Sequence, residues 1–472
     1  MSSPFRHQQG SIGEMIAIAL PMVISQSCDT VMIFTDRLFL SKLGPEQMNA
    51  AFGGGLTSFM MFSLFVGIVG YASALVAQYL GAGRKDKCAL VLTQALIISI
   101  VAYIPILLCR PLAHGLFQLM GVAPEQMAPQ NLYFDILLYG AVISLFRISL
   151  GSFFSGIGRT RIVMIASFTA MLVNMVLNYI FIFGKLGLSP MGIRGAAYGT
   201  LIGGFSGFLV LIAAYLNRRN ALDFGLAKSF RFDREAMFKL LRFGTPSGVE
   251  LFLNILAFNA TVLIFHAHGL VTATAATIVL NWDLVSFVPL IGVEIGVTSL
   301  VGRYMGAGDP DTAHRATMSG FKLGLAYSSV ILFLFLCFPE MLVRIFQPSG
   351  TGAIFDTAAP LAVMMVRLAS IYVLVEALFV VFIGALRGAG DTFWAMAISV
   401  SLHWIVVGAL YVMLRMLNMS PLAGWAALVG LFFVFSFIVF FRYQTGNWRK
   451  IKVVEPLPVV TVADGFHEPS EL

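Results

Sequence analysis

Two carboxylates lie inside an otherwise apolar stretch near the start of the chain. The segment from Met15 to Leu40 contains Asp29 and Asp36 and is long enough to cross a bilayer, which takes about 20 mostly apolar residues. A charged side chain at the bilayer centre costs at least ~2.5 kcal/mol, so this helix should face protein or water rather than lipid. We predict that it lines a transport cavity, that Asp36 handles a coupling ion, and that Asp29, two turns earlier, could contribute to the cavity wall or a proton step.

Further polar side chains could complete an ion site around Asp36. Asn174 and Asn178 are four residues apart and share one helix face, and Thr200 follows in the next apolar segment. With the carboxylate they would offer hard oxygen donors that suit Na⁺, whereas Asp36 alone could take up a proton. Two simpler roles stay open: the asparagines could only join helices by hydrogen bonds, and Asp36 could pair with Arg37 or another basic neighbour.

The second half of the chain carries its own polar candidates within or beside apolar segments. Carboxylates that face a cavity suit both cationic substrates and protons, so these residues could bind either. Two alternatives remain: Glu376 could pair with Arg367 without a transport role, and Asp391 could simply belong to a turn or cap a helix. The candidates are Glu250, Asn254, Asp283, Glu294, Glu376 and Asp391.

The composition is that of a polytopic membrane protein. Of 472 residues, 58% are hydrophobic and 11% are charged, with a mean hydropathy of +0.88, whereas soluble domains carry about 25% charged residues. The net charge of +7 is spread between apolar segments, which indicates membrane topology rather than nucleic-acid binding. Neither metal-ligand spacing nor a P-loop, HExxH or GxSxG motif is present, so we expect no enzyme, no cofactor and no bound metal apart from a possible Na⁺.

Hydropathy predicts an all-α protein of twelve transmembrane helices. Lysine and arginine are concentrated in the loops on the side of both termini, which places the termini in the cytoplasm. The predicted segments are roughly 15–40, 50–80, 88–109, 130–155, 162–184, 193–217, 243–267, 271–300, 316–338, 358–386, 393–416 and 422–442.

A long basic loop divides the chain near its middle. We predict an N-terminal six-helix bundle over 1–217, a cytoplasmic linker over 218–242, a C-terminal six-helix bundle over 243–442 and a polar cytoplasmic tail over 443–472. The stretch DREAMFKLLRF within this loop could form an interfacial helix or lie as an ordinary loop on anionic headgroups.

The two halves repeat each other. LVAQYLGAG (75–83) matches LVGRYMGAG (300–308), and the same offset places Pro21 on Pro246. SGIGRT (155–160) likewise matches RGAGDT (387–392). Six spans per half give both halves the same orientation, so we predict a pseudo-two-fold axis along the membrane normal, a central cleft and alternating access.

In this order the motifs resemble those of the multidrug and toxic compound extrusion (MATE) family. They are Pro21 with Asp36, VAQYLGAGR, SGIGRTR, VNMVLNYIFIFG with MGIRGAAYGT, FGTP, VGRYMGAGDP and GALRGAGDT. The resemblance implies a V-shaped protein of two six-helix bundles in the plasma membrane, here a bacterial inner membrane. It also implies export of organic cations or amphiphilic drugs in exchange for Na⁺ or H⁺, for which a monomer suffices.

The resemblance also bears on individual residues. In the family, the positions of Asp36, Asn174, Asn178 and Thr200 resemble an ion-binding cluster on the first, fifth and sixth helices, although many members have Asp where this chain has Asn178. The family acid of the seventh helix lies closer to Asn254 than to Glu250. The counterpart of Asp391 is implicated in coupling in some members.

A flippase for a lipid-linked, polyprenyl-phosphate type precursor is the alternative. Its cavity should present Arg or Lys to phosphates, whereas acids outnumber bases among the cavity candidates here. The arginines that keep this alternative open are Arg147, Arg367 and Arg387.

Overall fold

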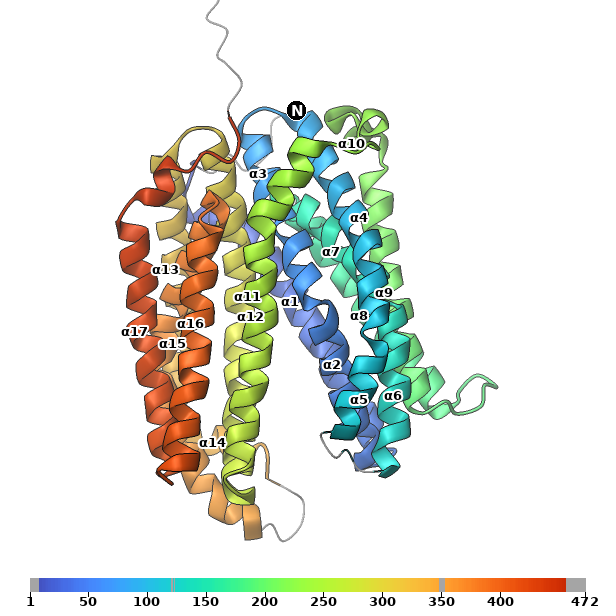
Figure 1. The fold of residues 1–472 in the computed structure, drawn as a ribbon, viewed down its shortest axis with the longest axis vertical. Coiled ribbons are helices and arrows are strands. Elements are labelled where there is room, and N and C mark those ends of the chain that lie inside the picture. Colours follow the sequence, from blue (N-terminus) through green and yellow to red (C-terminus); the bar gives the residue numbers. More distant parts are fainter. Residues whose placement is uncertain (1–7, 120–121, 123, 348–352, 456–472) are drawn as a thin grey trace, which may run out of the picture.

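The computed structural model describes residues 8–119, 122, 124–347 and 353–455. Within these residues, eleven helical spans are long and apolar enough to cross a membrane, and a pair of helices bent by 46° at Gly140 supplies a possible twelfth. The predicted all-helical, two-bundle architecture is confirmed. The helices of the two bundles diverge away from the end at which the first helix, α1 (Ile12–Ser41), begins (Figure 1). We call this end the terminal end and the opposite one the distal end.

The first bundle, here the N lobe, is formed by nine helical segments. Its second span runs from Glu46 to Gly81, with a turn residue at Tyr71 between α2 and α3, and its fourth is bent by 46° at Gly140. The segments are α1 (Ile12–Ser41), α2 (Pro45–Gly70), α3 (Ala72–Gly81), α4 (Lys85–Leu108), α5 (Arg110–Leu119), α6 (Pro124–Tyr139), α7 (Ala141–Gly156), α8 (Thr160–Phe183) and α9 (Ile193–Tyr215).

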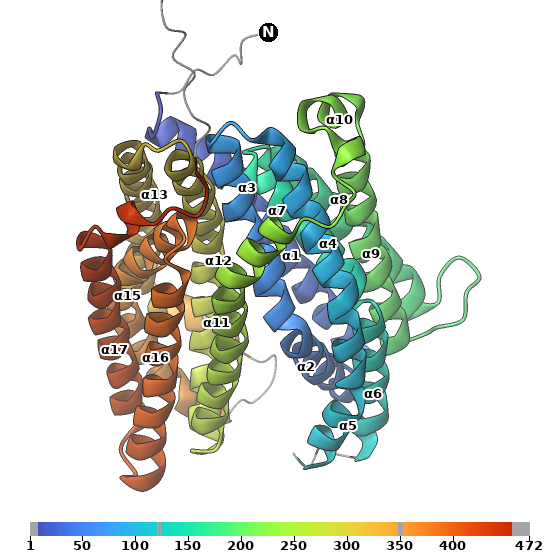
Figure 2. The ribbon, with the colours of Figure 1, turned by 45° about the horizontal axis from the view of Figure 1, so that its top comes forward.

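The second bundle, here the C lobe, follows two short connecting helices, α10 (Arg218–Phe224) and η1 (Leu226–Lys228). Figure 2 shows α10 at the terminal end above α8 and α9. The C lobe consists of α11 (Arg234–His266), α12 (Leu270–Gly306), α13 (Pro310–Cys337), α14 (Pro339–Arg344), α15 (Ala353–Ala389), α16 (Thr392–Leu410), η2 (Tyr411–Met416), α17 (Pro421–Gln444) and η3 (Asn447–Lys450).

Helix α11 begins inside the predicted linker. The side chain of Asp233 accepts a hydrogen bond from the backbone N–H of Ala236, which caps the helix at Arg234, and the helix runs on without a break through Pro246. DREAMFKLLRF is therefore not a separate interfacial helix but the first turns of the seventh span. The division of the chain into lobes at residues 217 and 243 stays a prediction.

The repeated motifs meet where α3 of the N lobe crosses α12 of the C lobe. A Cβ atom on Gly81 would lie 1.8 Å from the carbonyl oxygen of Arg303, and one on Gly306 would lie 2.0 Å from the carbonyl oxygen of Gln78. In the sequence repeat Gln78 aligns with Arg303 and Gly81 with Gly306. Each of the two glycines therefore contacts the residue that aligns with the other glycine's contact. Such reciprocal contacts are the expected consequence of a pseudo-two-fold axis.

The same symmetry appears inside each lobe. A Cβ on Gly156 would lie 2.6 Å from the carbonyl oxygen of Ser73, and one on Gly388 would lie 2.6 Å from that of Thr298. These are again aligned pairs of the repeat. Hydrogen bonds then join the lobes, since Gln78 Nε2 donates to the carbonyl oxygen of Gly388 at 2.7 Å.

Candidate functional site

Three helices of the N lobe bring the predicted ion-site residues together. Helix α8 packs against both α1 and α9. Small residues on α9 permit a close approach, because a Cβ on Gly199 would lie 1.9 Å from Asn178 Oδ1 and one on Gly203 would lie 2.8 Å from Asn174 Cβ. The polar face of α8, set by the four-residue spacing of its asparagines, is therefore held against the glycine face of α9.

Asp36 lies at the centre of this cluster. Thr200 Oγ1 donates to Asp36 Oδ2 at 2.9 Å, and Asn178 Nδ2 donates to the other carboxylate oxygen. Asn178 Nδ2 also lies 3.3 Å from Asn174 Oδ1, and Asn174 Nδ2 lies 3.3 Å from Thr200 Oγ1. Asp36 is 6% exposed and both asparagines are fully buried. Every donor in these bonds is neutral, so no cation compensates the carboxylate at hydrogen-bond distance.

One oxygen of the cluster is left over. Asn178 Oδ1 is buried and has no hydrogen-bond partner among the described residues. A buried acceptor without a partner is costly, and a bound cation or an ordered water would satisfy it. Asp36, Asn174, Asn178 and Thr200 carry hard oxygen atoms of the type that suits Na⁺, but Asn178 turns its Nδ2 and not its Oδ1 towards Asp36.

Arg37 does not neutralise this site directly. Its guanidinium carbon lies 4.6 Å from the centre of the Phe52 ring, in a cation–π arrangement. Within the described residues, Asp36 has no ion pair within 4 Å. The geometry therefore does not favour the simpler alternative of a rim aspartate paired with its basic neighbour.

Asp29 lies outside the Asp36 cluster, about two helical turns away on the same helix. It lies on α1, seven residues before Asp36, and Arg147 Nη1 of α7 lies 3.4 Å from Asp29 Oδ1. Both side chains are partly exposed. Asp29 is therefore an ion-paired residue and does not belong to the hydrogen-bonded cluster of Asp36.

In the C lobe, Glu250 and Glu294 share one arginine. Arg387 Nη2 lies 3.1 Å from Glu250 Oε2, and Arg387 Nη1 pairs with Glu294 Oε1. Glu250 is on α11, Glu294 on α12 and Arg387 on α15, so the triad ties three helices together. The triad carries a net charge of −1 when all three groups are ionised.

Among the described residues, the other two acids in the interior of the C lobe have no basic partner within 4 Å. Asp283 of α12 and Glu376 of α15 interact electrostatically, and Asp283 Oδ1 and Glu376 Oε2 are buried without a hydrogen-bond partner among the described residues. The alternative pairing of Glu376 with Arg367 is absent, since Arg367 Nη2 bonds Glu340 Oε1 at 2.6 Å at the surface.

The last two candidates make local contacts. Asn254 Nδ2 donates to Ser399 Oγ at 2.8 Å, which joins α11 to α16. Asp391 precedes α16 without capping it through its side chain, and instead receives two hydrogen bonds from Arg442, at 2.9 and 2.7 Å. Burial raises the pKa of Asp391 above its usual value, against the opposing effect of Arg442. Asp391 thus fastens the end of α17 to the start of α16.

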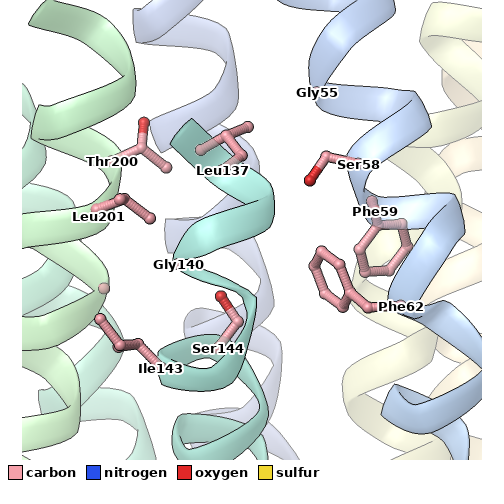
Figure 3. Close-up of a pocket in the computed structure, with 11 residues that line it drawn as sticks. Gly55, Ser58, Phe59, Phe62, Leu137, Gly140, Ile143, Ser144, Thr200 and Leu201 are labelled. Atoms are coloured by element: carbon pink, nitrogen blue, oxygen red, sulfur yellow. The ribbon is translucent and has the colours of Figure 1, made fainter. Parts of the chain in front are cut away.

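A cavity of about 150 Å³ lies next to the Asp36 cluster. Thr200 lines this cavity and also bonds Asp36, while the aromatic wall is formed by Phe59 and Phe62, whose rings meet edge to face. Figure 3 shows these side chains facing one another across the gap between α2, α7 and α9. The remaining lining residues are Gly55, Ser58, Leu137, Gly140, Ile143, Ser144, Leu201 and Gly204.

Comparisons with known proteins agree on one family. The family model MatE matches residues 21–180 and 246–413. A probable multidrug resistance protein NorM of Bradyrhizobium diazoefficiens is 27% identical, over 85% of this chain and 86% of the relative. The probable NorM of Thermotoga maritima is 26% identical, over 93% and 94%. The multidrug resistance protein PmpM of Pseudomonas aeruginosa is 26% identical, over 84% and 82%.

Solved structures show the same fold. A multidrug resistance MATE family transporter of the MOP superfamily, in an outward-facing conformation, superposes with a TM-score of 0.84 at 21% identity, over 93% of this chain and 97% of that one. A MOP superfamily transporter from Pyrococcus furiosus gives a TM-score of 0.84 at 22% identity, over the same shares of the two chains.

Proposed function

Because this chain belongs to the MATE family of membrane transporters, we propose that it is a secondary active multidrug efflux antiporter. It exports organic cations or amphiphilic drugs in exchange for Na⁺ or H⁺ by alternating access between its two lobes. The observation that carries this proposal is the Asp36 cluster, in which one buried carboxylate is bonded only to neutral donors.

The coupling ion binds at the Asp36 cluster. A cation entering here gains the attraction of a buried carboxylate whose hydrogen-bond donors are all neutral. The hard oxygens of Asp36 and of its neighbours Asn174 and Thr200 support Na⁺. A proton on Asp36 is the other possibility, because a single carboxylate suffices to carry it.

The substrate binds in the adjacent cavity, and Thr200 links the two sites. Its side chain both lines the cavity and bonds Asp36. An ion that replaces the hydrogen bond between Thr200 and Asp36 changes the wall that a substrate touches. The ion and the substrate therefore bind the same arrangement of Thr200 and the cavity wall with different affinities. Antiport requires such a difference.

The C lobe offers a second place for cations or protons. Asp283 and Glu376 have buried oxygens without partners, whereas Glu250 and Glu294 are already engaged by Arg387. Protonation of one member of the unpaired acids would relieve their mutual repulsion. We assign them to proton or substrate binding, and we assign the triad to holding α11, α12 and α15 together.

In this proposal the protein spans a bacterial inner membrane, and its terminal end faces the cytoplasm. The basic residues of the loops favour this orientation. One chain contains both lobes and would work as a monomer.

The lipid-precursor flippase loses support. Arg367 is paired at the surface and Arg387 is outnumbered by two glutamates, so of the three arginines only Arg147 lies in the interior without an excess of acids beside it.

The test is efflux of a fluorescent organic cation from proteoliposomes, with Na⁺ and pH gradients imposed separately. We expect one gradient to drive export by the wild type, and Asp36→Asn to abolish that drive while the protein stays folded. Asp223→Asn, an exposed aspartate paired with Arg159 on the connecting helix, is the control and should export normally. Failure of both gradients in the wild type would refute the antiporter; drive that survives in Asp36→Asn would move the coupling site to the C lobe.

A further inference from the structure

The chain continues past its last helix across the terminal end of the molecule. After η3 it becomes extended at Ile451, with φ −76° and ψ 119°. In both ribbon views this segment runs over the terminal end of the C lobe and ends beside α3 of the N lobe (Figure 1; Figure 2). Val453 and Val454 are each only 4% exposed, whereas Lys452 beside them is exposed. We call residues 451–454 the terminal strap.

One end of the terminal strap is anchored to the C lobe by stacked rings. Trp448 of η3 stacks on Tyr443 of α17 with ring centres 4.9 Å apart, and Trp448 Nε1 donates to the carbonyl oxygen of Tyr443 at 2.9 Å. Tyr443 also stacks on His314 of α13, and its hydroxyl lies 2.9 Å from His314 Nδ1. Arg449 Nη1 pairs with Asp311 Oδ1 at 2.9 Å. The turn from which the strap leaves is therefore fixed to the C lobe.

The other end of the terminal strap is buried where the two lobes meet. Val453 covers the turn at Gly390, where a Cβ would lie 2.4 Å from Val453 Cγ2 and 3.8 Å from Phe243 Cε1. Phe243 of α11 stacks on Tyr71, which lies between α2 and α3 in the N lobe. Both valines of the strap belong to the same buried hydrophobic cluster as Tyr71, and most members of this cluster are N-lobe residues. The strap thus follows the last helix of the C lobe but packs with the N lobe.

The turn beneath the strap already joins the lobes. Gln78 of α3 donates to the carbonyl oxygen of Gly388 at 2.7 Å, within the turn that Val453 covers. The beginning of the chain makes the converse crossing, because Ser319 Oγ of α13 donates to the carbonyl oxygen of Gly10, just before α1, at 2.7 Å. At the terminal end, a segment before the first helix is therefore fastened to the C lobe, and one after the last helix packs with the N lobe.

Apolar burial, and not backbone hydrogen bonding, holds the terminal strap in its seat. The N–H of Ile451 donates to the carbonyl oxygen of Trp448 at 3.3 Å, inside the anchored turn. No hydrogen bond joins the backbone of Val453 or Val454 to another of the described residues. The strap can therefore leave its seat without breaking backbone hydrogen bonds within the protein. Exposing each valine to water shifts the equilibrium by about tenfold.

We propose that the terminal strap stabilises the conformation that is closed at the terminal end, and that it leaves its seat when this end opens. Opening moves the anchored turn with the C lobe and moves Tyr71 with the N lobe. Because the strap is attached to the first and packs with the second, it cannot keep both contacts. The seated strap stabilises only the closed conformation, so it shifts the equilibrium between the two states. This inference rests on the alternating access of the proposed function, and not on its substrate or its coupling ion.

The test measures the separation of the lobes when the seat is weakened. In a cysteine-free background, spin labels at Leu222 on α10 and Gln444 at the end of α17, both exposed, report the distance across the terminal end by pulsed EPR in lipid nanodiscs. We expect Val453→Ser combined with Val454→Ser to raise the ratio of long to short distances by about tenfold or more, since apolar burial is lost. Lys452→Ser, at the exposed position of the same strap, is the matched control and should give the wild-type distribution.

A milder substitution examines the seat itself. Val453→Cys keeps a small apolar side chain, and its rate of reaction with a water-soluble maleimide measures how often the strap is out of its seat. We expect this thiol to react at least about tenfold more slowly than the thiol of Lys452→Cys, because one valine contributes about that factor. Equal rates would show that the strap is not seated and would overturn the proposal, even if the double serine variant does not fold.

The proposed function and this inference fail differently. If the wild type gives one short distance with and without Na⁺ and at every pH, alternating access is wrong and both proposals fail. If the wild type gives two distances and the double serine variant has the distribution of Lys452→Ser, the role of the strap is wrong and the efflux function stands. Thermal unfolding of each variant verifies that a change in distance is not a loss of fold.

Discussion

The crossing of α3 and α12 leaves no room for a side chain at Gly81 or Gly306. A Cβ on Gly81 would lie 1.8 Å from the carbonyl oxygen of Arg303, and real Cβ atoms essentially never come closer than 3.0 Å to such an atom. The helices would therefore have to separate by roughly 1.2 Å, and a backbone carbonyl cannot rotate away as a side chain could. We predict that Gly81→Ala opens the contact between the lobes at this crossing.

The size of the effect follows from two opposing contributions. Overpacking of a tight contact costs about 1–3 kcal/mol. An alanine within a helix gains up to about 1 kcal/mol over glycine. Gly430 of α17, where a Cβ would meet nothing within 4 Å, isolates the second contribution. Gly430→Ala should therefore raise stability slightly, while Gly81→Ala and Gly306→Ala shift the equilibrium between touching and separated lobes by roughly 5- to 150-fold.

Spin labels report the separation directly. Leu222 on α10 and Lys450 on η3 are exposed and lie on different sides of the crossing. In a cysteine-free background, the distance between labels at these positions should lengthen equally in Gly81→Ala and Gly306→Ala. The double variant should add little, because both substitutions disrupt one contact. If both single variants give the distance distribution of Gly430→Ala, the backbone crossing is not the contact that holds the lobes together.

Three further predictions concern charges and hydrogen bonds elsewhere. Gly199→Ala places a Cβ 1.9 Å from Asn178 Oδ1 and should reduce gradient-driven dye efflux as strongly as loss of the carboxylate that this amide bonds. Arg387→Gln leaves two buried glutamates without a cation and should destabilise the protein by about 3–5 kcal/mol in thermal unfolding, with recovery when both become glutamine. Burial raises the pKa of Asp233, but the hydrogen bond from Lys87 and a backbone N–H outweigh it, so the pKa lies below its usual value. The stability from this pair is present above about pH 4 and is lost as the pH falls through the lowered pKa, so the advantage of the wild type over Lys87→Gln, up to about 1 kcal/mol, should shrink in acid melting curves.

The N-lobe cluster could be predicted from sequence because its residues follow helical spacing. Asn174 and Asn178 had to share a face, and an acid within an apolar span had to avoid lipid. The structure adds what spacing cannot give, namely that Asn178 and Thr200 both donate to Asp36. The pseudo-two-fold relation between the lobes could also be predicted from the sequence repeat, since the aligned glycines make reciprocal contacts in the structure.

The C-lobe pairings could not be predicted in the same way. The partner of an arginine depends on which helices touch, so Arg367 bonds Glu340 and not Glu376, while Arg387 bonds two acids that lie 137 and 93 residues before it in the sequence. The 46° bend at Gly140 could not be predicted either. Hydropathy averages over a span and cannot register a bend that leaves its apolar residues unchanged.

The two lobes share backbone geometry but differ in charge at aligned positions. Ser155 of the N lobe aligns with Arg387 of the C lobe, and Ser299 donates to its carbonyl oxygen, whereas Arg387 binds two glutamates. The backbone contact between the lobes is symmetric, so it does not distinguish one lobe from the other as the place where the ion binds. The acidic side chains, which differ between the lobes, make this distinction. Asp36 is bonded only to neutral donors, and its partner Thr200 also lines the cavity, so a cation bound there acts directly on the cavity wall; we therefore expect the N lobe to lead the coupling.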